Sequence, residues 1–289
     1  MVADKIGSAT ELYGLIGNPV NKSFSPIMQN TFAKTFGFDA VYLPFKVESG
    51  MVKTAVDGAK ELGIKGFNVT VPHKVEVKSA LAGISPEAEM IGAVNTLKLT
   101  ENGYFGYNTD IIGLKKCFDI RNISIKDKTV VLGGAGGAAR SAAVLAGMEG
   151  AKKLVIVNRT KENAEKLADR VKSFFPIETE VKGWDELMTI ENPEIFIQTT
   201  TVGMSDESST PVKNAEFFDN VKYAADIIYT PWETRLLKEA AEHGVQCFNG
   251  FDMLFYQGIA SFEIWHDFKA DEEKAEALKN ELSEYYRGR

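Results

Sequence analysis

The fold of this chain is decided by the stretch TVVLGGAGGAAR at residues 129–140 and by its continuation KLVIVNRT at residues 153–160. An apolar, β-branched run leads through glycines into an Ala/Leu-rich segment, and a second apolar run follows Gly150. This order is typical of a βαβ unit that lies buried in a parallel sheet. We therefore expect a strand, a helix and a second strand over residues 129–160.

The turn between the first strand and the helix carries the spacing G-x-G-x-x-G/A. Gly134 allows a tight turn, Gly136 lets a pyrophosphate approach the backbone, and Ala139 is small where the helix packs on the strand. The N–H groups of a helix that begins near Gly137 would then point at phosphate. A glycine-rich loop that only turns a corner is the alternative, but the strand before it and the helix after it favour dinucleotide binding.

The residues after the second strand predict which dinucleotide binds. A site selective for NAD usually places Asp or Glu there, whereas this chain has Asn158, Arg159 and Thr160. A guanidinium can bind a 2′-phosphate through paired N–H donors, so the sequence favours NADP(H) over NAD(H). The alternative for Arg159 is a solvated charge at the start of a helix.

Composition and charge exclude several classes of protein. The 289 residues are 44% apolar and 25% charged, which is enough for two domains with ordinary cores. The formal net charge of −7 and the lack of a basic, aromatic-rich stripe argue against nucleic acid as a partner. Cys117 and Cys247 form no C-x-x-C pattern, and the three histidines have no metal-ligand spacing. We assign no metal and no disulfide.

The sequence also predicts a cytoplasmic protein without a membrane segment. No stretch approaches the roughly 20 uncharged apolar residues of a membrane helix. The first ten residues, from Met1 to Thr10, carry Asp4 and Lys5 and lack the apolar core of a signal peptide.

In the front half, two serines lie in a predicted loop from strand to helix. The apolar run at residues 12–17 predicts a strand, and Ser25 before Pro26 predicts the cap of a helix that runs to Gly37. Open α/β sheets bind ligands at such crossings. Ser25 is explained by capping alone. Ser23 offers a second hydroxyl in the same loop that can bind a polyol or a carboxylate, and the spacing favours a ligand role and a purely structural role equally.

Lys74 and Asp110 are the candidates for acid–base chemistry. Lys74 follows a strand at residues 66–71 and Pro72, so we expect it in a first helical turn, where a cation opposes the helix dipole. His73 is the neighbouring candidate, but adjacent helical residues point about 100° apart and we favour Lys74. Asp110 starts the next helix and either caps it or pairs with Lys74.

We expect an α/β protein of two domains. Residues 1–110 form the first, and residues 111–249 form a doubly wound, Rossmann-type domain with further strands at residues 195–200, 223–228 and 245–248. Two helices in residues 250–289 exceed what the second sheet needs, so we expect them to return to the first domain.

Several motifs, taken together and in order, resemble shikimate dehydrogenase over nearly the whole chain. They are Ser23-Phe24-Ser25-Pro26, Asn68-Val69-Thr70-Val71-Pro72-His73-Lys74, Gly92-Ala93-Val94-Asn95-Thr96, Asn108-Thr109-Asp110, Gly134-Ala135-Gly136-Gly137-Ala138, Asn158-Arg159-Thr160 and Tyr256-Gln257-Gly258. The pattern Asp-x-x-Tyr-x-Pro, which starts at Asp226, follows the family as well.

The resemblance implies reversible reduction of 3-dehydroshikimate to shikimate by NADPH, in the pathway to chorismate and aromatic amino acids. It implies that Lys74 and Asp110 are the catalytic pair and that the first domain binds the substrate. The implied substrate contacts are Ser23 and Ser25, which hold the carboxylate, and Thr70, Asn95, Tyr229 and Gln257. The implied NADP contacts are Gly134, Ala135, Gly136, Gly137, Ala138, Asn158, Arg159, Thr160, Ile227 and Gly250.

Two segments depart from the family pattern where the nicotinamide is expected. Residues 198–204 lack the usual Asn and Pro, and Asp252 replaces a common Gly. Two other functions stay open: a quinate/shikimate dehydrogenase that can use NAD, and a non-catalytic protein that senses NADPH. The expected partner is the small-molecule substrate, and the chain is expected to be a monomer or a homodimer.

Overall fold

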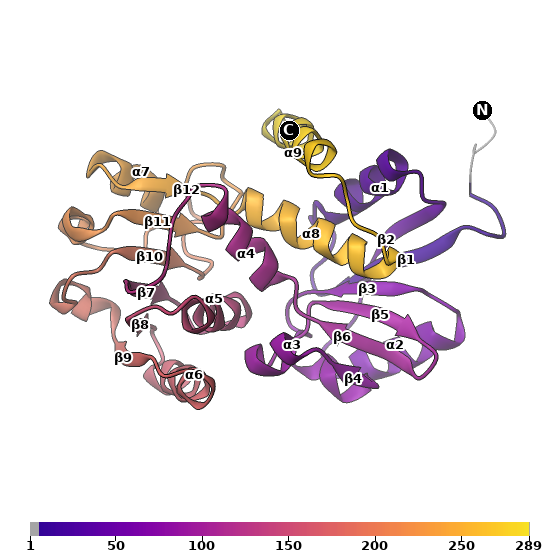
Figure 1. Cartoon of the computed structure of the whole chain (residues 1–289), viewed down its shortest axis with the longest axis horizontal. Coiled ribbons are helices and arrows are strands. Elements are labelled where there is room, and N and C mark those ends of the chain that lie inside the picture. The colour runs from indigo at the N-terminus through magenta and orange to yellow at the C-terminus, as the bar shows by residue number, and fades with distance from the viewer. Residues whose placement is uncertain (1–5, 289) are drawn as a thin grey trace. The chain divides into compact units, whose positions relative to one another are not determined.

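The chain folds into two α/β units (Figure 1). The computed structural model describes residues 6–288. Unit 2 is Leu114–Leu254, and unit 1 combines the residues up to Gly113 with those from Phe255 onward. The segment Met1–Thr10, inspected above for a signal peptide, is described only from residue 6, and residues 1–5 lie outside the described residues. No helix in the described part of the chain has the length and apolar character that crossing a bilayer requires.

Unit 2 alternates strands and helices. Its elements are β7 (Thr129–Gly133), α5 (Gly137–Met148), β8 (Lys153–Val157), α6 (Lys161–Phe174), β9 (Glu178–Lys182), η2 (Trp184–Thr189), β10 (Ile195–Gln198), η3 (Ala215–Asn220), β11 (Tyr223–Asp226), α7 (Arg235–Glu242) and β12 (Gln246–Phe248). The predicted strand, helix and strand over residues 129–160 are confirmed as β7, α5 and β8.

The sheet of unit 2 is doubly wound. Its strand order is β12-β11-β10-β7-β8-β9, and every neighbouring pair is parallel. The order reverses between β7 and β10, and ligands of open α/β sheets bind in the crevice at such a switch point. The glycine loop follows β7 directly, so the fold brings it to this point.

The core of unit 2 explains why the sheet strands are uninterrupted apolar runs. Alternate strand residues such as Val131, Val155 and Phe196 pack with Leu236 of α7 and Phe218 of η3, all fully or almost fully buried. The intervening strand residues face the other side, where α5 contacts β7 and α6 contacts β8. Both faces are therefore covered, as a parallel sheet requires.

Unit 1 contains the remaining elements. They are β1 (Glu11–Gly17), α1 (Ser25–Phe36), β2 (Ala40–Lys46), α2 (Val52–Glu61), β3 (Gly66–Val69), η1 (Glu76–Ala80), β4 (Gly83–Ile84), α3 (Pro86–Ile91), β5 (Thr96–Thr100), β6 (Gly103–Tyr107), α4 (Asp110–Asp119), α8 (Phe251–His266) and α9 (Glu272–Arg287). Of these, α4 and α8 each have residues in both units.

The sheet of unit 1 is mixed, with the order β2-β1-β3-β5-β6-β4. β1 pairs in parallel with β2 and β3, whereas β5 runs antiparallel to both β3 and β6. In the register, Asn68 lies opposite Thr96, and Thr96 lies opposite Tyr107. The carboxyl ends of β1, β3 and β6 therefore meet the amino end of β5 at one edge of the sheet.

Helices cover both faces of this sheet, and one of them, α8, comes from the C-terminal part of the chain. Val52 and Val56 of α2 pack on one face. On the other face Trp265 of α8 packs against Tyr13 and Tyr42, and its indole N–H donates to the Leu97 carbonyl at 2.8 Å. Part of α8 therefore packs on the sheet of unit 1, and Tyr286 of α9 packs edge to face on Phe24.

One strand was missed: β9 was not expected, because its sequence ETEVK is charged and lacks an apolar run. Two local predictions were wrong. Ser25 does not cap α1 with its side chain: the helix begins at Ser25 itself after Phe24, and the Ser25 N–H donates to Ser23 Oγ at 3.2 Å. Lys74 lies in a turn and not in a helix, because its carbonyl accepts the Val94 N–H at 2.8 Å and is not available for a helical hydrogen bond.

Candidate active site

The predicted residues of unit 1 gather at the sheet edge where β1, β3 and β6 end and β5 begins. Thr70 and Lys74 follow β3, Asn95 immediately precedes β5, and Asp110 follows β6 as the first residue of α4. Their distances along the chain are large, but parallel and antiparallel pairing together bring them to one edge.

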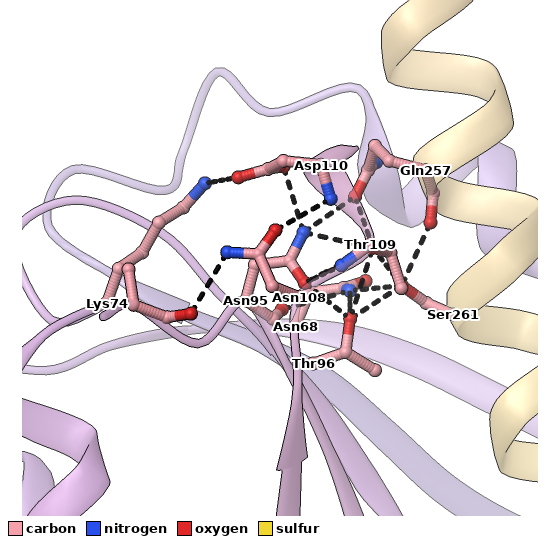
Figure 2. Close-up of polar contacts among 10 residues, drawn as sticks. Asn68, Lys74, Asn95, Thr96, Asn108, Thr109, Asp110, Gln257 and Ser261 are labelled. Carbon is pink, nitrogen blue, oxygen red and sulfur yellow. Dashed lines mark hydrogen bonds and ion pairs between the residues drawn. The ribbon is translucent and has the colours of Figure 1, made fainter. Parts of the chain in front are cut away.

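Lys74 and Asp110 form an ion pair at this edge. The Lys74 Nζ lies 2.6 Å from Asp110 Oδ2, and the two side chains are 19% and 8% exposed (Figure 2). Asp110 was expected either to cap α4 or to pair with Lys74. The pairing is observed, whereas the N-terminal N–H of α4 at Asp110 is bound by Asn108 Oδ1 at 3.0 Å. The two carboxylate oxygens of Asp110 bind other side chains: Oδ2 faces the Lys74 amine, and Oδ1 accepts from Asn95.

Asn95 supplies the second donor to Asp110. Its Nδ2 lies 2.9 Å from Asp110 Oδ1 and 2.9 Å from Thr109 Oγ1, and its Oδ1 accepts the Thr109 N–H at 2.7 Å. The Gln257 Oε1 lies 3.4 Å from the same Nδ2. One carboxylate thus receives an ammonium on one oxygen and an amide N–H on the other, which holds it in a single orientation.

Behind this pair lies a set of buried polar side chains that the sequence did not single out. Figure 2 shows them converging on the hydroxyl of Ser261 in α8. Ser261, Thr96 and Thr109 are completely buried, and Asn68 is 6% exposed. Buried polar groups on this scale require hydrogen-bond partners, and these groups supply them for one another. The available sequence signal was a serine four residues after Gln257 on a predominantly apolar helix.

Ser23, Ser25 and Thr70 lie at the same sheet edge without joining the Lys74 network. Ser23 N–H donates to the Val20 carbonyl, and Thr70 N–H donates to the Ile16 carbonyl. Across residues 6–288 no hydrogen bond or ion pair links any of these three side chains to Lys74 or Asp110. The three hydroxyls therefore flank the network and are not part of it.

His73 is excluded from the site by its burial. The ring is completely buried, and its Nε2 lies 2.8 Å from the Val47 carbonyl. The His73 ring therefore contacts Val47, whereas the Lys74 amine contacts Asp110.

In unit 2 the glycine loop has the geometry that its spacing predicts. Gly134 has φ +112°, a conformation that side chains rarely adopt, and a Cβ there would lie 2.6 Å from Thr199 Oγ1. Thr199 follows β10, so the contact joins the two strands of the switch point. A Cβ on Gly136 would meet no atom within 4 Å, and α5 begins at the next residue. The loop thus leaves open space at the start of a twelve-residue helix.

Arg159 is exposed at the end of β8. Within residues 6–288 its guanidinium makes no hydrogen bond and no ion pair. Asn158 Nδ2 donates to the Thr160 carbonyl at 2.8 Å and so shapes the turn that carries Arg159. The neighbouring Lys161, in contrast, pairs with Glu186 at 2.8 Å.

Ile227 and Gly250 touch through their backbones. A Cβ on Gly250 would lie 1.9 Å from the Ile227 carbonyl oxygen, so only glycine fits there. Asp226 organises the loop that follows β11 and contains Tyr229: its carboxylate accepts the Ile228 N–H at 3.0 Å and the Thr234 hydroxyl at 2.8 Å. Burial raises the pKa of Asp226 to about 6, against the opposing effect of these hydrogen bonds.

The two departures from the family pattern have local structural explanations. Gln198 is buried and bridges its own loop, since its Nε2 donates to Thr200 Oγ1 and its Oε1 accepts the Thr200 N–H. Asp252 pairs with Arg121 at 2.6 Å, and Arg121 lies over the ring of Phe248.

Three family models match the chain. The one described as "Shikimate dehydrogenase substrate binding domain" matches residues 15–97, "Shikimate / quinate 5-dehydrogenase" matches residues 115–217, and "Shikimate 5'-dehydrogenase C-terminal domain" matches residues 250–278. A curated relative from Methanocaldococcus jannaschii, named shikimate dehydrogenase (NADP(+)), is 40% identical over 96% of this chain and 98% of its own length. The chain belongs to the shikimate dehydrogenase family.

Solved structures of shikimate dehydrogenases share this fold. A crystal structure of a shikimate dehydrogenase in complex with NADP+ is 38% identical, covers 96% of this chain and 97% of that chain, and has a TM-score of 0.88. The enzyme from Listeria monocytogenes, in complex with shikimate and NAD, is 32% identical, covers 97% and 99%, and has a TM-score of 0.90. The family and the α/β fold predicted from the sequence motifs are confirmed.

The described residues of this shikimate dehydrogenase family member contain no candidate metal site. No group of three or more His, Cys, Asp or Glu side chains within residues 6–288 is arranged to hold a metal ion.

Proposed function

We propose that this protein is an NADP-dependent oxidoreductase that interconverts 3-dehydroshikimate and shikimate. The observation that carries the proposal is the Lys74–Asp110 ion pair, 2.6 Å long, in a chain of the shikimate dehydrogenase family. An amine and a carboxylate at one sheet edge provide the proton transfer that a ketone reduction requires.

In the reduction direction, the Lys74 ammonium gives a proton to the ketone oxygen at C3 of the substrate. Asp110 holds the amine at 2.6 Å and keeps it aimed at that oxygen, while Asn95 fixes the carboxylate from its other oxygen. In the oxidation direction the amine takes the proton back from the hydroxyl. Such positioned proton transfer typically contributes a factor of about 10² to 10⁴ to the rate.

The substrate carboxylate would be held by Ser23 and Ser25. Both lie just before or at the start of α1, where hydroxyl donors and the positive end of the helix dipole favour an anion. Thr70, Asn95 and Gln257 provide further donors and acceptors for the ring hydroxyls. Tyr229 is proposed as a further substrate contact.

The residues of unit 2 fit NADP. The open space in front of Gly136 and the start of α5 suit a pyrophosphate, and the unpaired, exposed guanidinium of Arg159 suits a 2′-phosphate. The other proposed NADP contacts in the glycine loop are Gly134, Ala135, Gly137 and Ala138. Further proposed NADP contacts, outside this loop, are Asn158, Thr160, Ile227 and Gly250. When bound, the nicotinamide supplies or accepts the hydride.

We also propose roles for the predicted domains. Residues 1–110, with 250–289, bind the substrate, and residues 111–249 bind NADP. The cytoplasmic location and the choice between monomer and homodimer stay predictions.

One assay tests the function. Nicotinamide absorbance is followed with shikimate or quinate as substrate, each with NADP or with NAD. We expect turnover with shikimate and NADP that exceeds every other combination. Turnover confined to quinate and NAD would favour the quinate/shikimate alternative, and no turnover with any pair, although NADPH binds, would favour a sensing protein.

A further inference from the structure

We propose that Ser261 is a positioning residue, whose hydroxyl orients the Asn95 amide and fixes Gln257 beside it. This inference rests on the proposed function, because it concerns the residues that would hold the substrate. The Ser261 hydroxyl contacts neither Lys74 nor Asp110. It acts on this pair through Thr109 and Asn95, which lie between Ser261 and Asp110.

The Ser261 hydroxyl is the centre of the buried network in Figure 2. Its Oγ lies 2.9 Å from Asn68 Nδ2, 2.8 Å from Thr96 Oγ1 and 3.0 Å from Thr109 Oγ1, and it donates to the Gln257 carbonyl at 3.0 Å. A hydroxyl has one proton and two lone pairs. With its proton on Gln257, it accepts from Asn68 and from only one of the two threonines.

The other hydrogen bonds decide which threonine donates to it. Thr96 donates to Asn95 Oδ1 at 2.9 Å, so its proton is not available to Ser261. Thr109 accepts from Asn95 Nδ2 at 2.9 Å and can give its own proton to Ser261, 3.0 Å away. The Ser261 proton then goes either to the Gln257 carbonyl or to Thr96 Oγ1, and in both arrangements Thr109 donates to Ser261.

That direction fixes the amide of Asn95. Its Oδ1 is held by the Thr109 N–H at 2.7 Å and by Thr96, and one Nδ2 proton is held by Thr109 Oγ1. The remaining Nδ2 proton points at Asp110 Oδ1, 2.9 Å away. A reversed amide would place an oxygen against that carboxylate and lose these bonds. Asn95 is thereby held as a donor to Asp110.

Removal of the Ser261 hydroxyl breaks the network at its centre. Thr109 would lose its acceptor, and its nearest other acceptors are Asn95 Oδ1 at 3.2 Å and Gln257 Oε1 at 3.4 Å. A Thr109 hydroxyl that turns to either atom changes the surroundings of Asn95 or Gln257. Replacement of a side chain that orients binding or catalytic residues typically lowers activity by about 10- to 100-fold.

The test is Ser261→Ala, assayed with shikimate and NADP. We expect the KM for shikimate to rise at least about 10-fold, while the Kd for NADPH, measured by fluorescence titration, stays within about twofold because its proposed contacts lie in unit 2. The matched control is Ser85→Ala, since Ser85 is also a buried hydroxyl of unit 1 and accepts the Ala88 N–H at the start of α3. That variant should lose stability with unchanged KM and kcat.

A second variant keeps the test decisive if Ser261→Ala does not fold. Thr109→Val removes the next hydroxyl of the network and keeps its volume, and it should raise the KM for shikimate similarly, whereas Thr109→Ser should restore it. Unchanged KM and kcat in Ser261→Ala and in Thr109→Val, with only a loss of thermal stability, would overturn the inference. Absence of turnover in the wild-type protein would instead contradict the proposed function.

Discussion

Replacement of Lys74 by Met separates catalysis from stability at the proposed site. The change removes the ammonium and keeps most of the apolar stem. The Asp110 carboxylate, 8% exposed, then keeps only the Asn95 donor at 2.9 Å on its other oxygen. A hydrogen bond between charged groups contributes about 1.5 to 3 kcal/mol to stability. Because Lys74 is 19% exposed and water can replace part of it, we expect a loss near the lower end of that range.

The expected kinetic loss is larger than the loss of stability. Without a positioned proton donor, kcat should fall at least about 100-fold. A loss of about 1.5 kcal/mol lowers the melting temperature by only about 3 to 6 °C in a unit of this size, so the variant stays folded at assay temperature. The Kd for NADPH should not change, because Lys74 lies in unit 1 and the proposed cofactor contacts lie in unit 2.

Two further variants make this prediction sharp. Lys78→Met is the matched control, since Lys78 is a lysine of the adjoining η1 that makes no ion pair within residues 6–288, and it should keep wild-type kcat. In Lys74→Met with Asp110→Asn, neither charge is left without its partner, so part of the lost stability should return while activity stays low. A kcat within about 10-fold of wild type in Lys74→Met would refute the assignment of proton transfer to this amine.

Three other changes test the remaining parts of the structure. Arg159→Ala should weaken NADPH binding about 10- to 100-fold and NADH binding little, as loss of a charge-assisted bond to the 2′-phosphate requires. The exposed Lys166→Ala, on the helix α6 that follows Arg159, should change neither, and equal weakening of both cofactors would contradict the assignment. Asp226→Asn removes a carboxyl whose pKa is raised from 3.8 to about 6 in the folded protein, so the stability that wild type gains from its protonation is present below about pH 4 and is lost as pH rises through 6. The melting temperature of the variant minus that of wild type should therefore be larger at about pH 7.5 than at about pH 5, by the equivalent of roughly 1 to 2 kcal/mol. A difference in melting temperature that does not vary with pH would contradict this explanation. Gly250→Ala should destabilise by about 1 to 3 kcal/mol, because its Cβ meets the Ile227 carbonyl, whereas Gly58→Ala in the open interior of α2 should stabilise; similar melting temperatures in both variants would refute this explanation.

The fold of unit 2 was predictable because its signals are local. Between Thr129 and Thr160 the strands are uninterrupted apolar runs and the turn is marked by glycines. The sequence of each element therefore also predicts where that element begins and ends. The space that a side chain at Gly134 would need is occupied by Thr199, which directly follows another strand, β10. That contact could not be derived from spacing, although the need for glycine could.

The wrong predictions in unit 1 arise from contacts between residues far apart in the sequence. Val-Pro-His-Lys before Glu76 has the pattern of a helix start, and nothing within that segment argues against one. The carbonyl of Lys74 is instead bound by the N–H of Val94, twenty positions along the chain, and a turn results. Likewise, Ser261 appears in the sequence as an isolated serine of an apolar helix, and only the packing of α8 on the sheet gives it partners.

The mixed pairing of the first sheet is what brings the proposed acid–base pair and its supports together. If β5 ran parallel to β3, Asn95 would lie at the opposite edge from Lys74. Because β5 is antiparallel to both neighbours, its amino end and the carboxyl end of β6 lie beside the end of β3, with Asn68, Thr96 and Tyr107 in one row. Asn95 and Asp110 then project from positions just beyond that row. A register shift of one residue in this hairpin would turn alternate side chains to the other face and remove Thr96 from Ser261, so the same pairing that buries the core also specifies the site.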